Sequence, residues 1–205
     1  MSSQVVGPQR RLRTAFSVLV VMAAVGVLSG CGGSDAATPQ PQAAAPAQPE
    51  QKLPPRPREL KVDGIDPCTL VTPEIRAQAG VTSQGQADAS STDNALKGCG
   101  YDNFPQHPTA ALDVNLATNQ DTAGFLFFPD AVPTTVAGFG AVDSPDSAAG
   151  ADHSCVVRVD VADNQGLWVS LYNTLGDDTA STHAQMCQKA HTVAESIMAG
   201  LLAKR

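Results

Sequence analysis

The chain has 205 residues and a formal net charge of −7, from 13 Lys and Arg against 20 Asp and Glu. This length is enough for one domain and a tail. The acidic balance repels phosphate backbones and anionic lipid headgroups, which argues against nucleic acid as a partner and against electrostatic attachment to a membrane.

The N-terminal 30 residues have the layout of a secretory signal peptide. A basic start with three arginines is followed by the uncharged apolar run 15–28, and Ser29 and Gly30 then lead directly into Cys31. The run of 14 residues is shorter than the ~20 that a membrane-spanning helix needs. We therefore expect residues 1–30 to be removed as a signal peptide.

The sequence Leu28-Ser29-Gly30-Cys31 resembles a bacterial lipobox. In lipoproteins the cysteine of this motif receives a diacylglyceryl group before cleavage, and its acyl chains, palmitate among them, hold the protein in the membrane. We therefore expect Cys31 to be the lipidation site and the protein to be anchored in the cell membrane, on its extracytoplasmic side.

A Pro- and Ala-rich segment follows the cysteine. Residues 32–58 hold seven prolines and few large apolar side chains, so we expect 31–64 to be an extended, disordered tether. Without the three arginines of the signal, the chain keeps ten Lys and Arg against 20 Asp and Glu, a net charge of −10. This charge falls on residues 65–205, which we expect to form the folded domain.

Four cysteines lie in that domain, at Cys68, Cys99, Cys155 and Cys187. An even number in an exported domain predicts two disulfides. A zinc site would favour closely spaced pairs, which are missing. Three pairings are open. We favour Cys68–Cys99 with Cys155–Cys187, because each closes a moderate loop worth ~3–4 kcal/mol in the chain-entropy model.

The first half of the domain contains short elements. Thr72 as N-cap, Pro73 and a stop at Gly80 predict a helix of about seven residues. Alternation predicts strands over 96–102 and 112–116. Residues 122–128 read as a short helix that Pro129 ends, and the glycine-broken stretch 136–142 is ambiguous.

The second half predicts a hairpin and a helix. Strands over 155–161 and 167–171 flank the turn 163–166. A helix capped by Asp178 or Thr179 runs to about residue 202, with an apolar stripe of Cys187, Ala190, Ala194, Ile197, Met198, Leu201 and Leu202. The fold class is α+β, an antiparallel sheet of about five strands flanked by the short N-terminal and the long C-terminal helix.

Two histidine-containing motifs invite a chemical interpretation. His183, Cys187 and His191 share one helix face and could bind a metal, but that face is the apolar stripe and Cys187 is expected to be oxidised. Adjacent Asp152, His153 and Ser154 cannot converge as a catalytic triad. We therefore expect no metal site, no cofactor and no catalytic residue.

The aromatic residues Tyr101, Trp168 and Tyr172 are the candidate binding surface. If Leu167 and its alternate neighbours face the core, Trp168 and Tyr172 face the opposite side of the sheet. Either a helix covers that side and buries them, or they line an open face or cleft suited to a partner or small ligand.

The block Asp66-Pro67-Cys68-Thr69-Leu70-Val71-Thr72-Pro73-Glu74 is similar to the D-P-C-x-L-(L/V)-(T/S)-P-E opening of the DUF3558 family of actinobacterial lipoproteins. The lipobox, the tether, Cys99-Gly100-Tyr101 and a cysteine in the closing helix also match the family's pattern. The resemblance spans residues 65–205. It implies a sheet flanked by helices and supplies no activity.

We expect a lipid-anchored binding or adaptor domain whose partner is a protein or a small molecule, with cationic partners favoured by the charge. Two alternatives remain open. An unrecognised cell-envelope enzyme would require His153, His183 or His191 to meet a carboxylate or serine in a pocket. A structural envelope component would show a flat patch and no pocket.

Overall fold

The computed structural model describes residues 52–88, 95–106, 109–146, 153–173 and 181–204. The expected signal peptide, Cys31, most of the tether, and the cap candidates Asp178 and Thr179 lie outside these ranges. Over the described ranges, no helix has the length and apolar character needed to cross a membrane.

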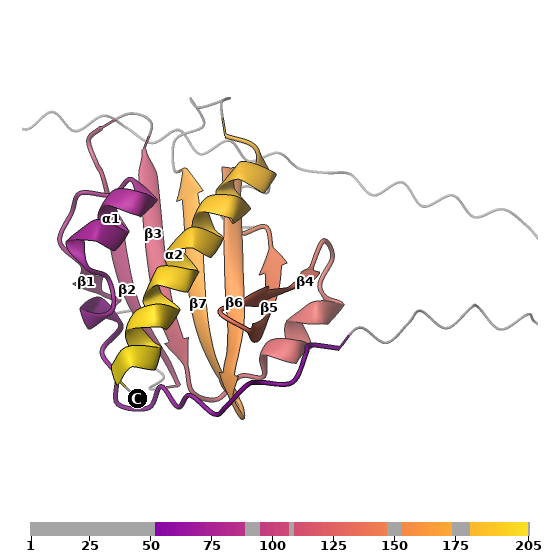
Figure 1. Ribbon diagram of the computed structural model, residues 1–205. Helices are drawn as coiled ribbons and strands as arrows, with labels where there is room; N and C mark the ends of the chain where they lie inside the picture. Colours follow the sequence, from indigo (N-terminus) through magenta and orange to yellow (C-terminus); the bar gives the residue numbers. More distant parts are fainter. Residues whose placement is uncertain (1–51, 89–94, 107–108, 147–152, 174–180, 205) are drawn as a thin grey trace, which may run out of the picture. The chain divides into compact units, whose positions relative to one another are not determined.

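The described residues form one antiparallel sheet of seven strands, in the order β1-β2-β3-β7-β6-β5-β4 (Figure 1). The prediction of about five strands was therefore too low. The strands are β1 (Gln86–Ala87), β2 (Leu96–Asp102), β3 (Ala110–Ala117), β4 (Val132–Val136), β5 (Phe139–Ser144), β6 (Ser154–Ala162) and β7 (Gln165–Asn173).

The ambiguous stretch 136–142 proves to hold the turn and part of a hairpin, β4–β5. Val136 pairs with Phe139 across Ala137 and Gly138, which have φ values of 51° and 84°. Positive φ at both central residues suits the tight turns that join antiparallel strands. Gly138 and Gly140 interrupt the apolar alternation, which is why the sequence pattern missed these strands.

Capping and turn residues in the sequence predicted the positions of helix α1 and of the β6–β7 hairpin. Helix α1 (Pro73–Ala79) begins after Thr72, whose Oγ1 accepts a hydrogen bond from the Ile75 N–H, and ends at Gly80 with a φ of 78°. The predicted β6–β7 hairpin is present, with a turn of two residues, Asp163 and Asn164, in place of the predicted 163–166. Two short 3₁₀ helices complete the set, η1 (Pro67–Thr69) and η2 (Thr122–Phe127).

Helix α2 (His183–Lys204) begins later than predicted, and its start forms a capping box. The Thr182 N–H donates to Gln185 Oε1 at 2.8 Å, and the Gln185 N–H donates to Thr182 Oγ1 at 3.4 Å. The predicted apolar stripe is confirmed, although Cys187 and Leu202 are only partly buried. The buried residues of α2 are Met186, Ala190, Val193, Ala194, Ile197, Met198 and Leu201.

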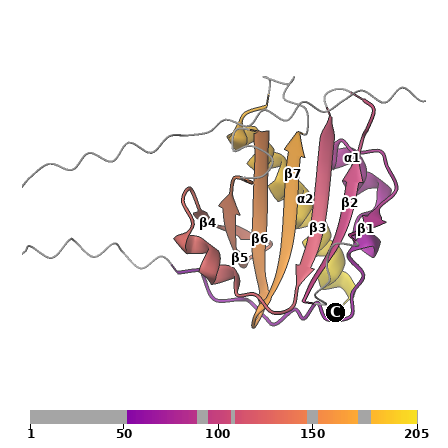
Figure 2. The same ribbon diagram turned by 180° about the vertical axis from the view of Figure 1, so that it is seen from behind.

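Both α-helices lie on the same face of the sheet, where α2 packs on β6 and β7 and α1 packs on α2 (Figures 1 and 2). The core fills the space between these two layers. Leu112, Val157 and Val169 contribute from the strands, and Ile197 and Met198 contribute from α2. The opposite face of the sheet, turned toward the viewer in Figure 2, is called the far face below.

Residues 52–64, called the strap below, correct the predicted domain boundary at residue 65. Leu60 and Val62 are 2% and 1% exposed and belong to the core. The Leu60 N–H donates to the Val161 carbonyl oxygen at 2.8 Å, and the Val62 N–H donates to Gln165 Oε1 at 2.8 Å. The strap runs past the ends of β6 and β7 (Figure 1), so residues 52–64 belong to the folded domain.

Candidate functional site

The far face carries Trp168, Ser170 and Tyr172, as the alternation of β7 predicted. Their neighbours Leu167, Val169 and Leu171 are buried in the core beneath the helices. Trp168 and Tyr172 themselves are partly buried. Figure 2 shows this side of β3, β7 and β6 in front, with α2 behind them.

Tyr101 does not belong to this surface, so that part of the predicted site is wrong. Tyr101 is 4% exposed and lies opposite Leu112, on the helix-covered face. Its hydroxyl donates to the Cys68 carbonyl oxygen at 3.1 Å, and burial raises the pKa of this phenol. The alternation of β2 had already put Tyr101 on the face of Cys99, whose disulfide lies in the core.

Around Trp168, the far face is built from stacked aromatic and cationic groups. Helix η2 brings the Phe125 ring edge-on to Trp168, with ring centroids 5.2 Å apart. The Arg158 guanidinium carbon lies 4.4 Å from the centroid of Phe125 and 5.5 Å from that of Trp168. Burial lowers the pKa of Arg158, and its Nη1 donates to Ser144 Oγ at 2.6 Å. This short helix therefore covers the Trp168 part of the far face.

Three apolar residues beside this stack face solvent. Phe127 is 89% exposed, Phe128 is 58% exposed and Val132 is 55% exposed. The ring centroids of Phe125 and Phe128 lie 5.5 Å apart, which joins the exposed group to the stack. We call Phe127, Phe128 and Val132 the phenylalanine edge. The sequence analysis missed it, although two consecutive phenylalanines just before a proline cannot both turn toward the sheet.

A polar cleft of about 340 Å³ lies over β1, β2 and β3. Its floor contains Gly98 and Gly100, where an added Cβ would come within 2.5 Å of Asn115 Oδ1 and 2.9 Å of Asp113 Oδ1. The missing side chains on β2 thus make room for the polar groups of β3. The cleft is lined by Gln86, Ala87, Asp88, Gly98, Cys99, Gly100, Asp113 and Asn115.

Asp113 gives this cleft its electrostatic character. Burial is the main cause that raises the pKa of Asp113, and nearby Asp88 and Asp146 raise it further. The Tyr172 hydroxyl donates to Asp113 Oδ2 at 2.8 Å, which opposes that rise. A partly desolvated carboxylate with acidic neighbours is stabilised by an approaching positive charge. The cleft is therefore suited to a cationic group.

A larger cavity of about 750 Å³ lies between the strap and η2. Arg56 of the strap binds Asp160 at 2.8 Å and Asp163 at 2.9 Å, and it also pairs with Glu59. The cavity therefore has one wall fixed by ion pairs and another formed by Phe127. The lining residues are Lys52, Leu53, Pro54, Pro55, Arg56, Arg58, Glu59, Asp121, Ala123, Gly124, Phe127 and Asp160.

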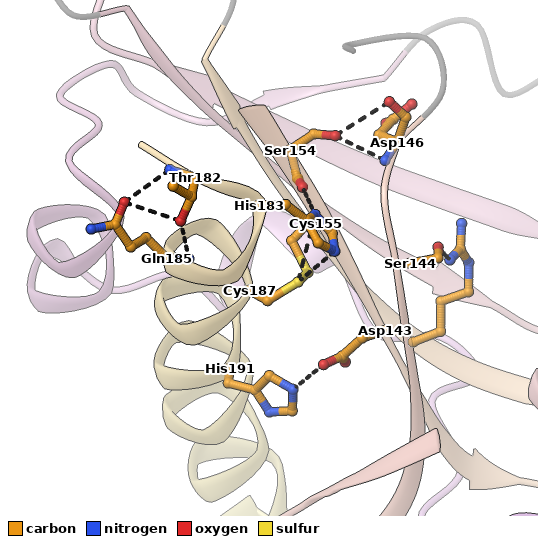
Figure 3. Close-up of a disulfide and its surroundings, with 11 residues drawn as sticks. Asp143, Ser144, Asp146, Ser154, Cys155, Thr182, His183, Gln185, Cys187 and His191 are labelled. Carbon is orange, nitrogen blue, oxygen red and sulfur yellow. Dashed lines mark hydrogen bonds and ion pairs between the residues drawn. A yellow bond between two sulfur atoms is a disulfide. The ribbon is translucent and has the colours of Figure 1, made fainter. Parts of the chain in front are cut away.

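Of the three residues considered and rejected as a metal site, His183 and Cys187 lie close together, whereas His191 binds Asp143 instead. Nε2 of His191 lies 2.7 Å from Asp143 Oδ2, and this hydrogen bond is the main cause that raises the pKa of His191. His183 instead lies beside a disulfide (Figure 3). Nδ1 of His153 lies 3.2 Å from the Ser181 carbonyl oxygen.

His191 and Asp143 form the histidine–carboxylate pair that the enzyme hypothesis requires. Neither residue lines the polar cleft or the cavity beside the strap. The hydroxyl of Ser154, in the motif Asp152-His153-Ser154, forms hydrogen bonds with the backbone of Asp146. The pair joins α2 to β5.

The cysteines are paired as the sequence analysis favoured. Cys68 is bonded to Cys99, which ties η1 to β2, and Cys155 is bonded to Cys187, which ties β6 to α2. The two loops have similar sequence separations, 31 and 32 residues. Each disulfide thus joins the sheet to an element outside it.

A family model described as "Protein of unknown function (DUF3558)" matches residues 26–199. No curated protein and no solved structure matches the chain.

Proposed function

Because the chain belongs to the DUF3558 family, whose function is unknown, we propose from its own residues that it is a lipid-anchored domain that binds a partner outside the cell membrane. In this proposal Cys31 carries the acyl chains, and the residues up to the strap separate the domain from the lipid. The partner binds on the far face and the adjoining phenylalanine edge.

The phenylalanine edge is the observation that carries this proposal. Phe127 and Phe128 keep most of their surface in water, although burying an aromatic side chain gains about 1.5–3 kcal/mol. Aromatic residues are enriched at the buried centres of protein interfaces. The stack of Phe125, Arg158 and Trp168 supports the edge from behind, so a partner would meet a preorganised surface.

The polar cleft adds a preference for positive charge. Asp113 and Asp88 contribute carboxylates there, and the mature chain would carry a net charge of −10. Complementary charge speeds encounter and selects among partners more than it adds affinity. We therefore propose a protein or small-molecule partner that presents an apolar surface together with a cationic group.

Catalysis is the second candidate function, because the pKa of His191 is raised beside Asp143. It ranks below binding because neither residue lines the two cavities described above. Loss of a measured activity in His191→Gln, with partner capture unchanged, would move catalysis to first place.

Lipid attachment is tested with Cys31→Ser. Cells fed a fatty acid alkyne should label the wild-type protein, and the variant should carry no label because serine lacks the sulfur that accepts the diacylglyceryl group. The measurement is in-gel fluorescence of the immunoprecipitated protein. Labelling of the variant at the wild-type level would exclude Cys31 as the anchor.

Partner binding is tested with Phe127→Ser/Phe128→Ser. We expect this double variant to lose most of the capture of a partner from envelope extract, measured by cross-linking and mass spectrometry, because it removes the exposed apolar surface. Trp168→Ala should weaken capture by disturbing the stack that supports the edge.

The matched control is Phe104→Ser. Phe104 is 72% exposed and lies in the loop after β2, away from η2 in the sequence. This variant should capture the partner as the wild type does. Equal capture by the wild type, the double variant and the control would refute a role for the phenylalanine edge.

A further inference from the structure

Cys155, His183 and Cys187 place three metal-ligating atoms within 4.8 Å of one another. The first lies at the start of β6, and the other two lie in the first turns of α2 (Figure 3). Over the described residues, Cys68 and Cys99 have no comparable cluster around them. The two disulfides therefore differ in chemical surroundings, although their loops are nearly equal in length.

The hydrogen bond of His183 determines which of its nitrogens is free. Nδ1 lies 2.6 Å from the carbonyl oxygen of Ser154. A carbonyl can only accept, so Nδ1 carries the proton and Nε2 keeps its lone pair. Metal-binding histidines use this same arrangement, in which the other ring nitrogen donates to a backbone carbonyl or carboxylate.

The distances between the ligating atoms of Cys155, His183 and Cys187 suit a tetrahedral metal ion. With Zn–S at about 2.3 Å and Zn–N at about 2.0–2.1 Å, a nitrogen and a sulfur ligand of a tetrahedral zinc ion are separated by about 3.5 Å, and two sulfur ligands by about 3.8 Å. Nε2 of His183 lies 3.5 Å from Cys187 Sγ, and the Cα atoms of Cys155 and Cys187 lie 5.0 Å apart. Nδ1 is 4.0 Å from the same sulfur, so Nε2 is the ring nitrogen nearer to Cys187 Sγ while Nδ1 keeps its bond to Ser154.

We propose that reduction of the Cys155–Cys187 disulfide converts this cluster of Cys155, His183 and Cys187 into a site for Zn²⁺ or another thiophilic divalent cation. A dithiol reductant supplies two electrons and two protons to the disulfide and is itself oxidised to a disulfide. The two thiols then each release a proton to solvent as they bind the metal. His183 Nε2 is the third ligand, and water completes the tetrahedron.

Burial and redox state together define how such a site works. Cys155 is fully buried and Cys187 is partly buried, so access to the metal position runs past Cys187 and His183. While the disulfide is intact, neither sulfur is a thiolate and the site is closed. A disulfide oxidant restores the closed form: it takes two electrons from the two metal-bound thiolates and two protons from solvent and leaves as two thiols, while Cys155 and Cys187 form their disulfide and the cation is released. Metal occupancy thus depends on redox state.

The experiment uses the purified protein, reduced with a dithiol and kept free of oxygen. One Co²⁺ per chain should bind with thiolate-to-cobalt absorption, and native mass spectrometry with Zn²⁺ should show the mass of one zinc minus two protons. Zn²⁺ should also raise the melting temperature of the reduced protein. The unreduced protein should show none of these changes.

Variants assign the ligands. Cys187→Ala should abolish the thiolate-to-cobalt absorption of the pair, and His183→Ala should weaken Zn²⁺ binding by at least roughly tenfold. His183→Asn repeats the second test with a side chain of more similar size. The matched control Cys68→Ala/Cys99→Ala removes the other cysteine pair and should bind metal as the wild type does.

Three results would overturn the proposal. One is that the reduced wild type binds no metal while circular dichroism shows its strands intact. Another is metal binding that is unchanged in both His183 variants. The last is metal binding that disappears in Cys68→Ala/Cys99→Ala when that variant remains folded.

Discussion

The pair of His191 and Asp143 makes stability depend on pH in a definite direction. Its hydrogen bond raises the pKa of His191 above the ordinary value of 6.5, so the folded state binds this proton more tightly than the unfolded state. The resulting stabilisation is fully present below about pH 6.5 and is lost as the pH rises through the folded pKa.

We therefore expect His191→Gln to lose about 0.5–1 kcal/mol of unfolding free energy at about pH 5.5 and much less at about pH 8.5. Urea unfolding at the two pH values measures this difference. His153→Gln serves as the control, because Nδ1 of His153 lies near a backbone carbonyl oxygen and the carbonyl carries no net charge. A larger loss for His191→Gln at the alkaline pH would contradict the sign.

At the scale of elements, the strap is an integral part of the fold. Leu60→Ala should lower the unfolding free energy by about 2–5 kcal/mol, because it leaves a cavity at a core position that is 2% exposed. Lys61→Ala changes an exposed neighbour and should stay within about 0.5 kcal/mol of the wild type. Chemical denaturation measures both variants, and equal values would mean that the strap does not contribute to the core.

Local signals account for the elements that the sequence predicted. Thr72, Pro73 and Gly80 mark both ends of α1, and the alternation of β6 and β7 around a two-residue turn marks their hairpin. These signals act within a few residues of the backbone they control. The strap and the β4–β5 hairpin carry no such local signal. Prolines in the strap and glycines in the hairpin interrupt the apolar pattern, and the apolar side chains of both segments become buried only in the tertiary structure.

The same reasoning predicted only part of the candidate site. Alternation alone put Trp168 and Tyr172 on the far face. Helix η2 covers Trp168 and leaves Phe127 exposed. Both features depend on how this short helix packs on a strand that is distant in the sequence, which the alternation pattern does not determine. Tyr101 differs because it shares its face of β2 with Cys99 and is therefore buried beneath the helices.

For the whole molecule, the two disulfides determine how far the layers can separate. We expect unreduced protein to show no free thiol at Cys68, Cys99, Cys155 or Cys187 when it is alkylated and mapped by mass spectrometry. Reduction should cost about 3–4 kcal/mol per disulfide, because each closes a loop of about 30 residues in the unfolded chain. Stoichiometric labelling of Cys187 in unreduced protein would contradict the pairing.

The position of the strap has a mechanical consequence. In a chain anchored at Cys31, a pull between the cell surface and a bound partner would enter the domain through Lys52, pass Leu53 and Pro54, which lie against Gly140, and then reach Arg56. Its ion pairs with Glu59, Asp160 and Asp163 resist that load before the backbone bond of Leu60 does. Tension therefore peels the strap from its end and spares the central strands. Arg56 also lines the cavity beside Phe127, so the first region to yield adjoins the phenylalanine edge.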